Sequence, residues 1–385
     1  MSHTTHSSLL LVSLLASACG GGMPEGLERS SASDSASVRQ AIGSVQFSQA
    51  VAANWHSLAL STAGDVYGWG IPEQAGHSSA YAPYIMTPKK LDRLSNIAEI
   101  VSAHQFSYAV GLDGSLYCWG DCNISARDSM TWKVSGISNA ISASTGTSHS
   151  LVLLDTGKII AWGDNTYGQL GDGTFARRST PQEVIGIPGF VVSVAAQAWG
   201  SLALTAEGNV YWWGSFDYNG GPESVNPRPV KVTGLTDIRY IAAGEKHALA
   251  LDRSGQVWSW GFNLNGELGL GYVGTVKTIN RVPTLSSIRF ISAGYHTGYA
   301  LATDGSVFAW GFNWCGLGDG TSTALHASPI KLPGVTNLQR LSAGNFHVVA
   351  IDTSRRVEAW GCNNYAQLGN GTFIDEYSPI WARTP

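Results

Sequence analysis

The stretch 161–174 reads AWGDNTYGQLGDGT, and its Trp162-Gly163 pair recurs along the chain. The seven copies of this pair begin at Trp69, Trp119, Trp162, Trp213, Trp260, Trp310 and Trp360. Successive copies are 43 to 51 residues apart. Seven copies at a nearly constant period of this length indicate one ring or solenoid of stacked units, although a chain of 385 residues would otherwise suggest two or three domains.

Each copy contains the pattern of four short strands. Five residues before each tryptophan stands a glycine, or once Arg355, which suits a tight hairpin turn. Strand-like apolar runs flank this turn, as in 247–251 and 256–260, and a third strand such as 238–243 precedes them. A fourth strand is predicted to start at a proline, as in 229–232 and 329–332. Four strands in each of seven copies predict an all-β, seven-bladed β-propeller.

The two ends of the repeat region bear on how the ring closes. The chain enters at a first strand, 45–53, and leaves at a last strand, 378–383. We expect these N- and C-terminal strands to close the ring, with 46–51 in the same blade as Trp381, because a shared sheet leaves no free edge.

Composition agrees with this fold class and limits the function. The chain has 46 Gly and 14 Trp, and 13% of its residues are charged, as is typical of a turn-rich all-β protein. The net charge of -4 gives no reason to expect a nucleic-acid partner.

The N-terminus is predicted to be a processing segment. Residues 9–18 form an apolar run that is too short to span a bilayer and ends in small residues before Cys19. This pattern predicts a signal peptide over 1–18, a Gly- and Ser-rich tether over 19–44 and the propeller over 45–385. The order Leu-Ala-Ser-Ala-Cys at 15–19 resembles the lipobox of bacterial lipoproteins, which implies a lipidated Cys19 and, with Gly20 after it, an outer-membrane or cell-surface location. An ordinary signal with a chance cysteine, giving a secreted or periplasmic protein, is the alternative.

The repeat also resembles a known family. The patterns Ala-Gly-x-x-His, Gly-x-Val-x-x-Trp-Gly and Asn-x-x-Gly-Gln-Leu-Gly-x-Gly-Thr resemble the regulator of chromosome condensation repeat over about 45–385, although copies 1, 2 and 4 lack Gly-Gln-Leu-Gly. A WD-type propeller would have Trp-Asp at the place of Trp-Gly. The resemblance implies a seven-bladed propeller. Among its members are a nuclear nucleotide-exchange factor for a small GTPase and a secreted bacterial inhibitor of β-lactamases that uses aromatic loop tips. The inhibitor indicates one form that binding of a partner protein could take here.

Strand direction predicts which face binds. In antiparallel blades, the loops between strands one and two and the loops after Trp-Gly emerge on one face, here called the loop-rich face, and the tight turns emerge on the opposite, hairpin face. Binding residues concentrate on displayed loops. The candidate residues are Trp55, His104, Trp199, Glu245, Lys246, Tyr295, His296 and Phe346 at the first loop tips, with Trp314 and Tyr365 in the second loop set. Truncation of such aromatic anchors costs about 2 kcal/mol or more at a hot spot. The alternative is that these rings pack on neighbouring loops or plug the channel.

The histidines and cysteines give weaker signals. His56, His149, His247 and His347 recur thirteen residues before a tryptophan, but no carboxylate or cysteine recurs with them. We therefore expect structural histidines bonded to the backbone, and neither a metal nor a cofactor. Cys118, Cys122, Cys315 and Cys362 are even in number, and pairing of Cys118 with Cys122 and of Cys315 with Cys362 is one possibility.

These observations predict a class of function without naming the partner. The chain is expected to be an exported, lipid-anchored, monomeric module that binds a protein through the aromatic loop tips. It is not expected to be an enzyme, because the tips offer no nucleophile and base pattern. An extracytoplasmic enzyme or a carbohydrate-binding propeller that uses the same face is the alternative.

Overall fold

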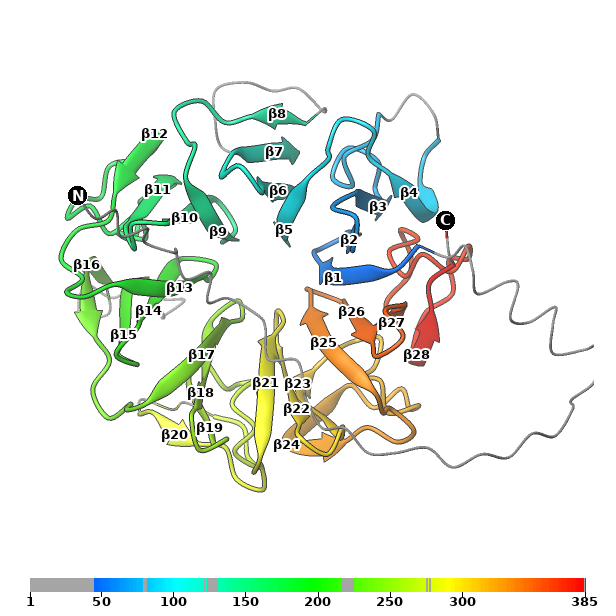
Figure 1. Cartoon of the computed structure of the whole chain (residues 1–385). Helices are drawn as coiled ribbons and strands as arrows, with labels where there is room; N and C mark the ends of the chain where they lie inside the picture. Colours follow the sequence, from blue (N-terminus) through cyan, green and yellow to red (C-terminus); the bar gives the residue numbers. More distant parts are fainter. Residues whose placement is uncertain are drawn as a thin grey trace, which may run out of the picture. The chain divides into compact units, whose positions relative to one another are not determined.

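The computed structural model describes residues 45–78, 82–120, 122, 131–215, 225–274, 276, 278–383 and 385. The predictions for the signal peptide at 1–18, for Cys19 and for the tether at 19–44 lie outside these residues. Val45–Pro385 forms one compact unit, in which seven four-stranded antiparallel sheets surround an axis (Figure 1). The prediction of an all-β, seven-bladed propeller with four-stranded blades is confirmed, and the described residues contain no helix.

The blades follow one another in chain order. Blades 1 to 3 consist of β1 (Phe47–Ala52), β2 (His56–Ser61), β3 (Val66–Gly70) and β4 (Ile85–Lys90); β5 (Ile97–Ala103), β6 (Phe106–Gly111), β7 (Leu116–Gly120) and β8 (Trp132–Lys133); and β9 (Ala140–Thr145), β10 (His149–Leu154), β11 (Ile159–Gly163) and β12 (Arg178–Glu183). Blades 4 and 5 consist of β13 (Val191–Ala196), β14 (Gly200–Thr205), β15 (Val210–Ser215) and β16 (Val225–Lys231); and β17 (Ile238–Ala243), β18 (His247–Asp252), β19 (Val257–Gly261) and β20 (Asn280–Arg281). Blades 6 and 7 consist of β21 (Ile288–Ala293), β22 (Thr297–Ala302), β23 (Val307–Phe312) and β24 (Leu325–Lys331); and β25 (Leu338–Ala343), β26 (His347–Asp352), β27 (Val357–Gly361) and β28 (Glu376–Trp381).

The Trp-Gly pair lies at or one residue before the end of the third strand of every blade, and it joins that blade to the one before it. Each of these tryptophans is buried, because a large apolar ring suits the space between two sheets. The indole N–H needs an acceptor there, and Trp213 Nε1 donates to Gln169 O of blade 3 at 2.8 Å, as Trp360 does to Leu317 O of blade 6 at 3.0 Å. The glycine that follows has a positive φ, 109° at Gly163, where a Cβ would lie 2.4 Å from Ser148 O. The motif thus fixes both the blade interface and the exit of the loop.

The ring closes differently from the expectation. β1 belongs to the sheet of β2–β4 and β28 to the sheet of β25–β27, so the prediction that 46–51 share a blade with Trp381 is wrong. Each blade is one continuous segment, and the terminal blades meet by packing. Phe47 and Ala50 share an apolar cluster with Val349 and other residues of blade 7, and Phe47 N donates to Arg355 O at 2.9 Å.

The outer strands begin earlier than predicted. β16 and β24 start four residues before Pro229 and Pro329, so these prolines lie inside the strands. The pairing register of β16 with β15 shifts between Trp212 and Gly214, which leaves residues 227–229 in a bulge. A bulge on an edge strand tolerates proline, because the missing N–H would have had no ladder partner.

None of the described segments is a helix of the length and apolar character that crossing a membrane requires.

Candidate functional site

The first loop tips of blades 4 to 7 and of blade 1 are joined by backbone hydrogen bonds. Each bond crosses from one blade to the next: Ala198 N to Glu245 O, Glu245 N to Tyr295 O, Tyr295 N to Gly344 O, and Asn345 N to Ala53 O, at 3.1 to 3.3 Å. The Ala-Gly step before the tips has a steric reason. A Cβ at Gly244 would lie 2.5 Å from Gly294 O, and one at Gly344 would lie 2.3 Å from Ala53 O. The loop tips therefore form a continuous, rigid arc.

The inner ends of the seven first strands surround a cavity of about 240 Å³ on the propeller axis, here called the axial cup. Most of its lining residues are alanine, serine or glycine. The larger polar side chains in the lining are His104, Gln197, Glu245, Tyr295 and Asn345. The cup is thus a narrow space whose chemistry depends on a few polar groups.

Five of the six predicted Trp, Tyr and Phe residues fall into two groups, and Trp199 packs separately on Tyr167. In the first, Tyr295 contacts Phe346 with ring centroids 6.1 Å apart, and Phe346 contacts Trp314 at 5.8 Å. In the second, Trp55 contacts Tyr365 at 5.5 Å. Trp314 is 60% exposed, whereas Trp55, Trp199, Tyr295, Phe346 and Tyr365 are half-buried. Most tips thus pack on neighbouring loops, as the alternative interpretation held, and their role in binding stays a prediction.

The predicted charged tips of blades 5 and 6 do come together. Lys246 Nζ lies 5.0 Å from the Trp199 ring centroid and 3.8 Å from Glu245 Oε1. His296 Nε2 is 4.0 Å from Glu245 Oε2, and its Nδ1 is 3.1 Å from Glu267 Oε1. These four side chains are almost completely enclosed. They form a compact cluster of two carboxylates, one ammonium group and one imidazole.

Glu267 was missed by sequence reasoning, although a signal was present. It occupies the place of Gln169 and Gln367 in the Gly-Gln-Leu-Gly segment. Gln169 Oε1 accepts the N–H of Tyr167, and Glu267 Oε2 accepts that of Asn265 in the same way, at 2.8 Å. The change from amide to carboxylate adds the contact with His296. A glutamate at this repeat position, beside a histidine in the next blade, could have indicated the cluster.

His104 lies apart from the charged cluster, on blade 2. Its backbone has a positive φ of 45°, and its Nε2 is 3.0 Å from Thr147 Oγ1. Burial lowers the pKa of the His104 imidazole to about 4, so the side chain is neutral at pH 7. His104 therefore contributes a polar but uncharged group to the axial cup.

The most exposed apolar residues of the loop-rich face were also missed, apart from Trp314. All seven belong to the loops that follow Trp-Gly: Phe175, Leu264, Tyr272, Val273, Trp314, Phe373 and Ile374. Among the described residues, the loops of the hairpin face carry three exposed large apolar side chains, Leu112, Ile185 and Phe190, and the remaining seven lie on strands. Phe175 and Phe373 directly follow Gly-Thr in two copies of the repeat, which is the signal that could have identified them.

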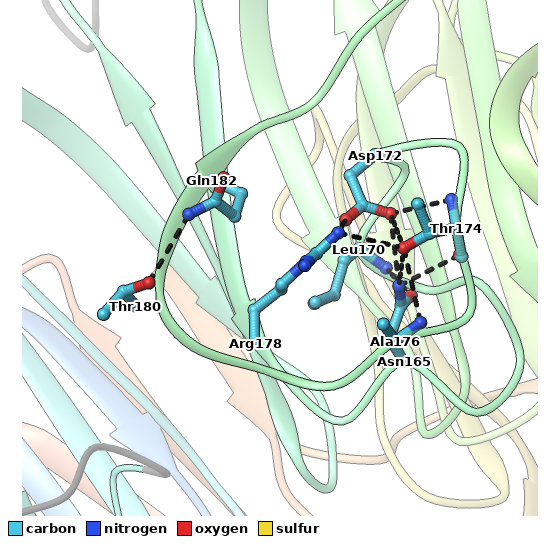
Figure 2. A network of polar contacts seen from close by, with 8 residues as sticks. All are labelled: Asn165, Leu170, Asp172, Thr174, Ala176, Arg178, Thr180 and Gln182. Atoms are coloured by element: carbon cyan, nitrogen blue, oxygen red, sulfur yellow. Dashed lines mark hydrogen bonds and ion pairs between the residues drawn. The ribbon is translucent and has the colours of Figure 1, made fainter.

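A polar network holds these loops in place. In blade 3, the side chain of Asn165 accepts from Leu170 N at 2.9 Å and donates to Thr174 O at 3.0 Å (Figure 2). Asp172 accepts from Thr174 N and from Arg178 Nε, both within 2.9 Å (Figure 2). All of these partners lie within the loop and the strand that follows it. The network explains Leu-Gly-Asp-Gly-Thr as loop structure, and it fixes the position from which Phe175 projects.

The recurring histidines join blades, but through a different partner from the one expected. His56, His149 and His347 place Nε2 at 2.6 to 2.9 Å from Ser107, Ser201 and Ser57 Oγ in the next blade. The expectation of structural histidines holds, whereas the expected backbone partner is replaced by a serine hydroxyl. For His247, Gly298 stands at the sequence position of this serine in the next blade, and neither ring nitrogen has a hydrogen-bond partner.

The four cysteines are paired as Cys118–Cys122 and Cys315–Cys362. The second disulfide joins the loop of blade 6, beside Trp314, to the end of β27 in blade 7. Asp375 lies close to both sulfur atoms. Because these cysteines are consumed in a disulfide, they do not offer the thiolates that a zinc site needs.

A seven-bladed propeller that displays long loops on one face defines the class of this protein. A sequence model of the RCC1-like domain family matches residues 126–384, and the chain belongs to that family. Human E3 ubiquitin-protein ligase HERC2 is 30% identical over 250 residues, which are 60% of this chain and 5% of that protein. The ultraviolet-B receptor UVR8 of Arabidopsis thaliana is 31% identical over 249 residues, which are 60% of this chain and 57% of the receptor. The chain thus spans less than two thirds of each of these relatives.

Among solved structures, Prp20p from Saccharomyces cerevisiae is similar, with a TM-score of 0.71 and 21% identity over 88% of each chain. At this identity the likeness shows the fold alone. RCC1-like propellers act in protein interaction, are mostly regulators, and have a fold that is not itself catalytic.

Proposed function

We propose that this chain is a protein-interaction module that binds a partner protein through the loop-rich face. The observation that carries the proposal is the distribution of exposed apolar side chains over the loops: among the described residues, seven large ones lie on the loops after Trp-Gly and three on the loops of the hairpin face, while seven others lie on strands. Apolar residues gathered on one face of a soluble body are typical of a contact surface. Membership of the RCC1-like domain family supports the proposed role in binding a protein, because RCC1-like propellers act in protein interaction.

Within this face, the exposed residues contact the partner and the half-buried residues hold them in position. Trp314 and Phe373 project from loops that are held by hydrogen bonds and by a disulfide, so little conformational entropy is lost when a partner covers them. Half-buried rings support these anchors: Tyr295 contacts Phe346, which contacts Trp314, and Tyr84 contacts both Tyr365 and Phe373. Aromatic anchors on a rigid support are where interface energy concentrates.

The test compares two matched double variants in a pull-down followed by mass spectrometry. Trp314→Ala plus Phe373→Ala removes anchors from the loop-rich face, and Leu112→Ala plus Phe190→Ala removes exposed apolar residues from the hairpin face. We expect the first variant to bind a specific partner at least ~30-fold more weakly, as a loss of about 2 kcal/mol at even one anchor implies, and the second to retain it. Equal recovery of every partner by both variants would overturn the proposal.

For residues 1–44, we propose export and lipid anchoring at Cys19. The support is the sequence alone: the apolar run 9–18 and the lipobox-like order that ends at Cys19. In a bacterial host grown with labelled palmitate, we expect label on the wild-type chain and none on Cys19→Ser. Equal labelling of both chains, or retention of residues 1–18 in the mature protein, would contradict this part of the proposal.

A further inference from the structure

The axial cup is shaped to receive a side chain rather than a folded segment. Its volume of about 240 Å³ lies below the ~300–1,000 Å³ of pockets that hold drug-sized ligands. The small lining residues, such as Ala242, Ala293 and Ala343, leave this space open at the centre of the loop-rich face. Tyr295, which lines the cup and also contacts Phe346, connects the cup with the proposed contact surface.

Glu245 supplies the one carboxylate in the lining of the cup, which contains no lysine, arginine or aspartate among the described residues. Its side chain is 9% exposed, and Oε2 is buried without a hydrogen-bond partner. A buried acceptor left unsatisfied costs about 1–3 kcal/mol, and more when it is charged. A donor brought to this position would therefore be bound favourably.

The neighbouring charged groups do not supply a hydrogen-bond donor to Glu245 Oε2. Lys246 Nζ lies on the side of Oε1, at 3.8 Å, and its ammonium group faces the rings of Trp199 and Phe262 at 5.0 and 5.4 Å. His296 directs Nδ1 to Glu267 at 3.1 Å, while its Nε2 is 4.0 Å from Glu245 Oε2, beyond hydrogen-bonding distance. The two carboxylates, Glu245 and Glu267, outnumber the one ammonium group beside the cup.

We propose that the axial cup binds a basic side chain, a lysine or arginine at the tip of a loop of the partner protein, with Glu245 as its acceptor. This inference rests on the proposed function, because the same face must contact the partner. Charge complementarity selects a cationic group, and Tyr295 in the lining offers a ring on which a guanidinium group can stack. An arginine inserted on the axis would set the orientation of the partner while the outer anchors supply most of the contact area.

The experiment titrates the full chain with N-acetyl-arginine methylamide and with its neutral counterpart, N-acetyl-citrulline methylamide, and measures Kd by ligand-observed NMR. We expect the arginine probe to bind at least 5-fold more tightly than citrulline to the wild type. Glu245→Gln should abolish this preference, whereas Glu183→Gln, a surface residue paired with Lys158, should retain it. Equal binding of the two probes to the wild type, or an unchanged preference in Glu245→Gln, would overturn the proposal.

A second variant, Ala242→Val, tests the cup independently in case Glu245→Gln does not fold. Ala242 pairs with Leu249 as Val101 pairs with Tyr108, so Ala242→Val places in blade 5 a residue that blade 2 already carries. This variant narrows the cup without touching the charges, and we expect it to weaken arginine binding at least 2-fold. If arginine binding is unchanged in Ala242→Val, the cup is not the site. Failure of these tests, with partner binding still lost in Trp314→Ala plus Phe373→Ala, would leave the proposed function intact.

Discussion

At the residue scale, the seven copies of the repeat act as internal controls for one another. His149 reaches Ser201, whose hydroxyl donates to Gln169 O at 2.8 Å, so the imidazole Nε2–H is the donor to the serine. His247 has no such partner, because Gly298 stands where the serine would be. Blade 2 carries Phe106 at the same position, which shows that an apolar ring fits there.

This comparison predicts opposite effects of one substitution at two sites. His149→Phe loses a buried hydrogen bond and should lower the free energy of unfolding by about 1–2 kcal/mol. His247→Phe removes two unsatisfied ring nitrogens and should be neutral or stabilising. Urea denaturation of both variants at pH 8 measures the difference. A larger loss for His247→Phe than for His149→Phe would contradict the assignment.

At the element scale, the sequence predicted the strands well and the closure badly. Each blade repeats a local pattern, so Trp-Gly and the hairpin glycine locate three of its strands. In a cyclic repeat, however, the pattern does not define where one blade ends and the next begins. The alternation of 46–51 is equally compatible with a strand of blade 1 and with a strand that shares a sheet with 378–383. The contacts of Phe47 with blade 7 decide this, and they depend on packing between distant segments. The exposed Phe175 and Phe373 were missed for a different reason: both lie 13 residues after their tryptophan, beyond the positions of Trp314 and Tyr365, which were the only residues predicted to bind in the loops after Trp-Gly.

The two disulfides should contribute unequally to stability. Cys315–Cys362 closes a separation of 47 residues and joins two blades, whereas Cys118–Cys122 closes a separation of four within one blade. The loss of chain entropy in the unfolded state corresponds to about 4 kcal/mol for the longer loop and about 2 kcal/mol for the shorter one. We expect Cys315→Ser plus Cys362→Ser to lower Tm more than Cys118→Ser plus Cys122→Ser. A calorimetric scan of both variants without reductant checks this order, and the reverse order would refute it.

At the scale of the whole molecule, ionisable groups buried between the blades link stability to pH. Burial lowers the pKa of His149 and His247 to about 4, and that of His56 and His347 to about 3, from 6.5. The folded state thus binds fewer protons than the unfolded chain. This stability is fully present above pH 6.5 and is lost as pH falls toward 4. Each histidine accounts for about 3 kcal/mol, so together they rival the 5–15 kcal/mol that typically stabilises a domain.

Glu99 on the inner strand β5 acts in the opposite direction. Burial raises the pKa of its carboxyl group to about 7 from 4.5, and Oε2 has no hydrogen-bond partner. The folded state therefore holds a proton that the unfolded chain releases, and the stabilisation present below pH 4.5 is lost as pH rises through 7. At the same register in blade 1, Gln49 accepts from Ile100 N at 3.0 Å and donates to Ile100 O at 2.8 Å. An uncharged amide at Glu99 should make the corresponding pair of bonds to blade 3 at any pH.

Acid lowers the stability contributed by four buried histidines and raises that contributed by one buried glutamate. The histidines outnumber the glutamate, so the propeller should unfold in mild acid. We expect Tm of the wild type to fall between pH 6.5 and pH 4. Glu99→Gln should match the wild type near pH 4.5 and exceed it in Tm at pH 8, where the wild-type carboxylate is charged and buried. Circular dichroism melts from pH 4.5 to 8 measure both effects, with Glu183→Gln as the surface control. A Tm difference between Glu99→Gln and wild type that does not change with pH would show that Glu99 titrates normally, and a flat wild-type profile would show the same for the histidines.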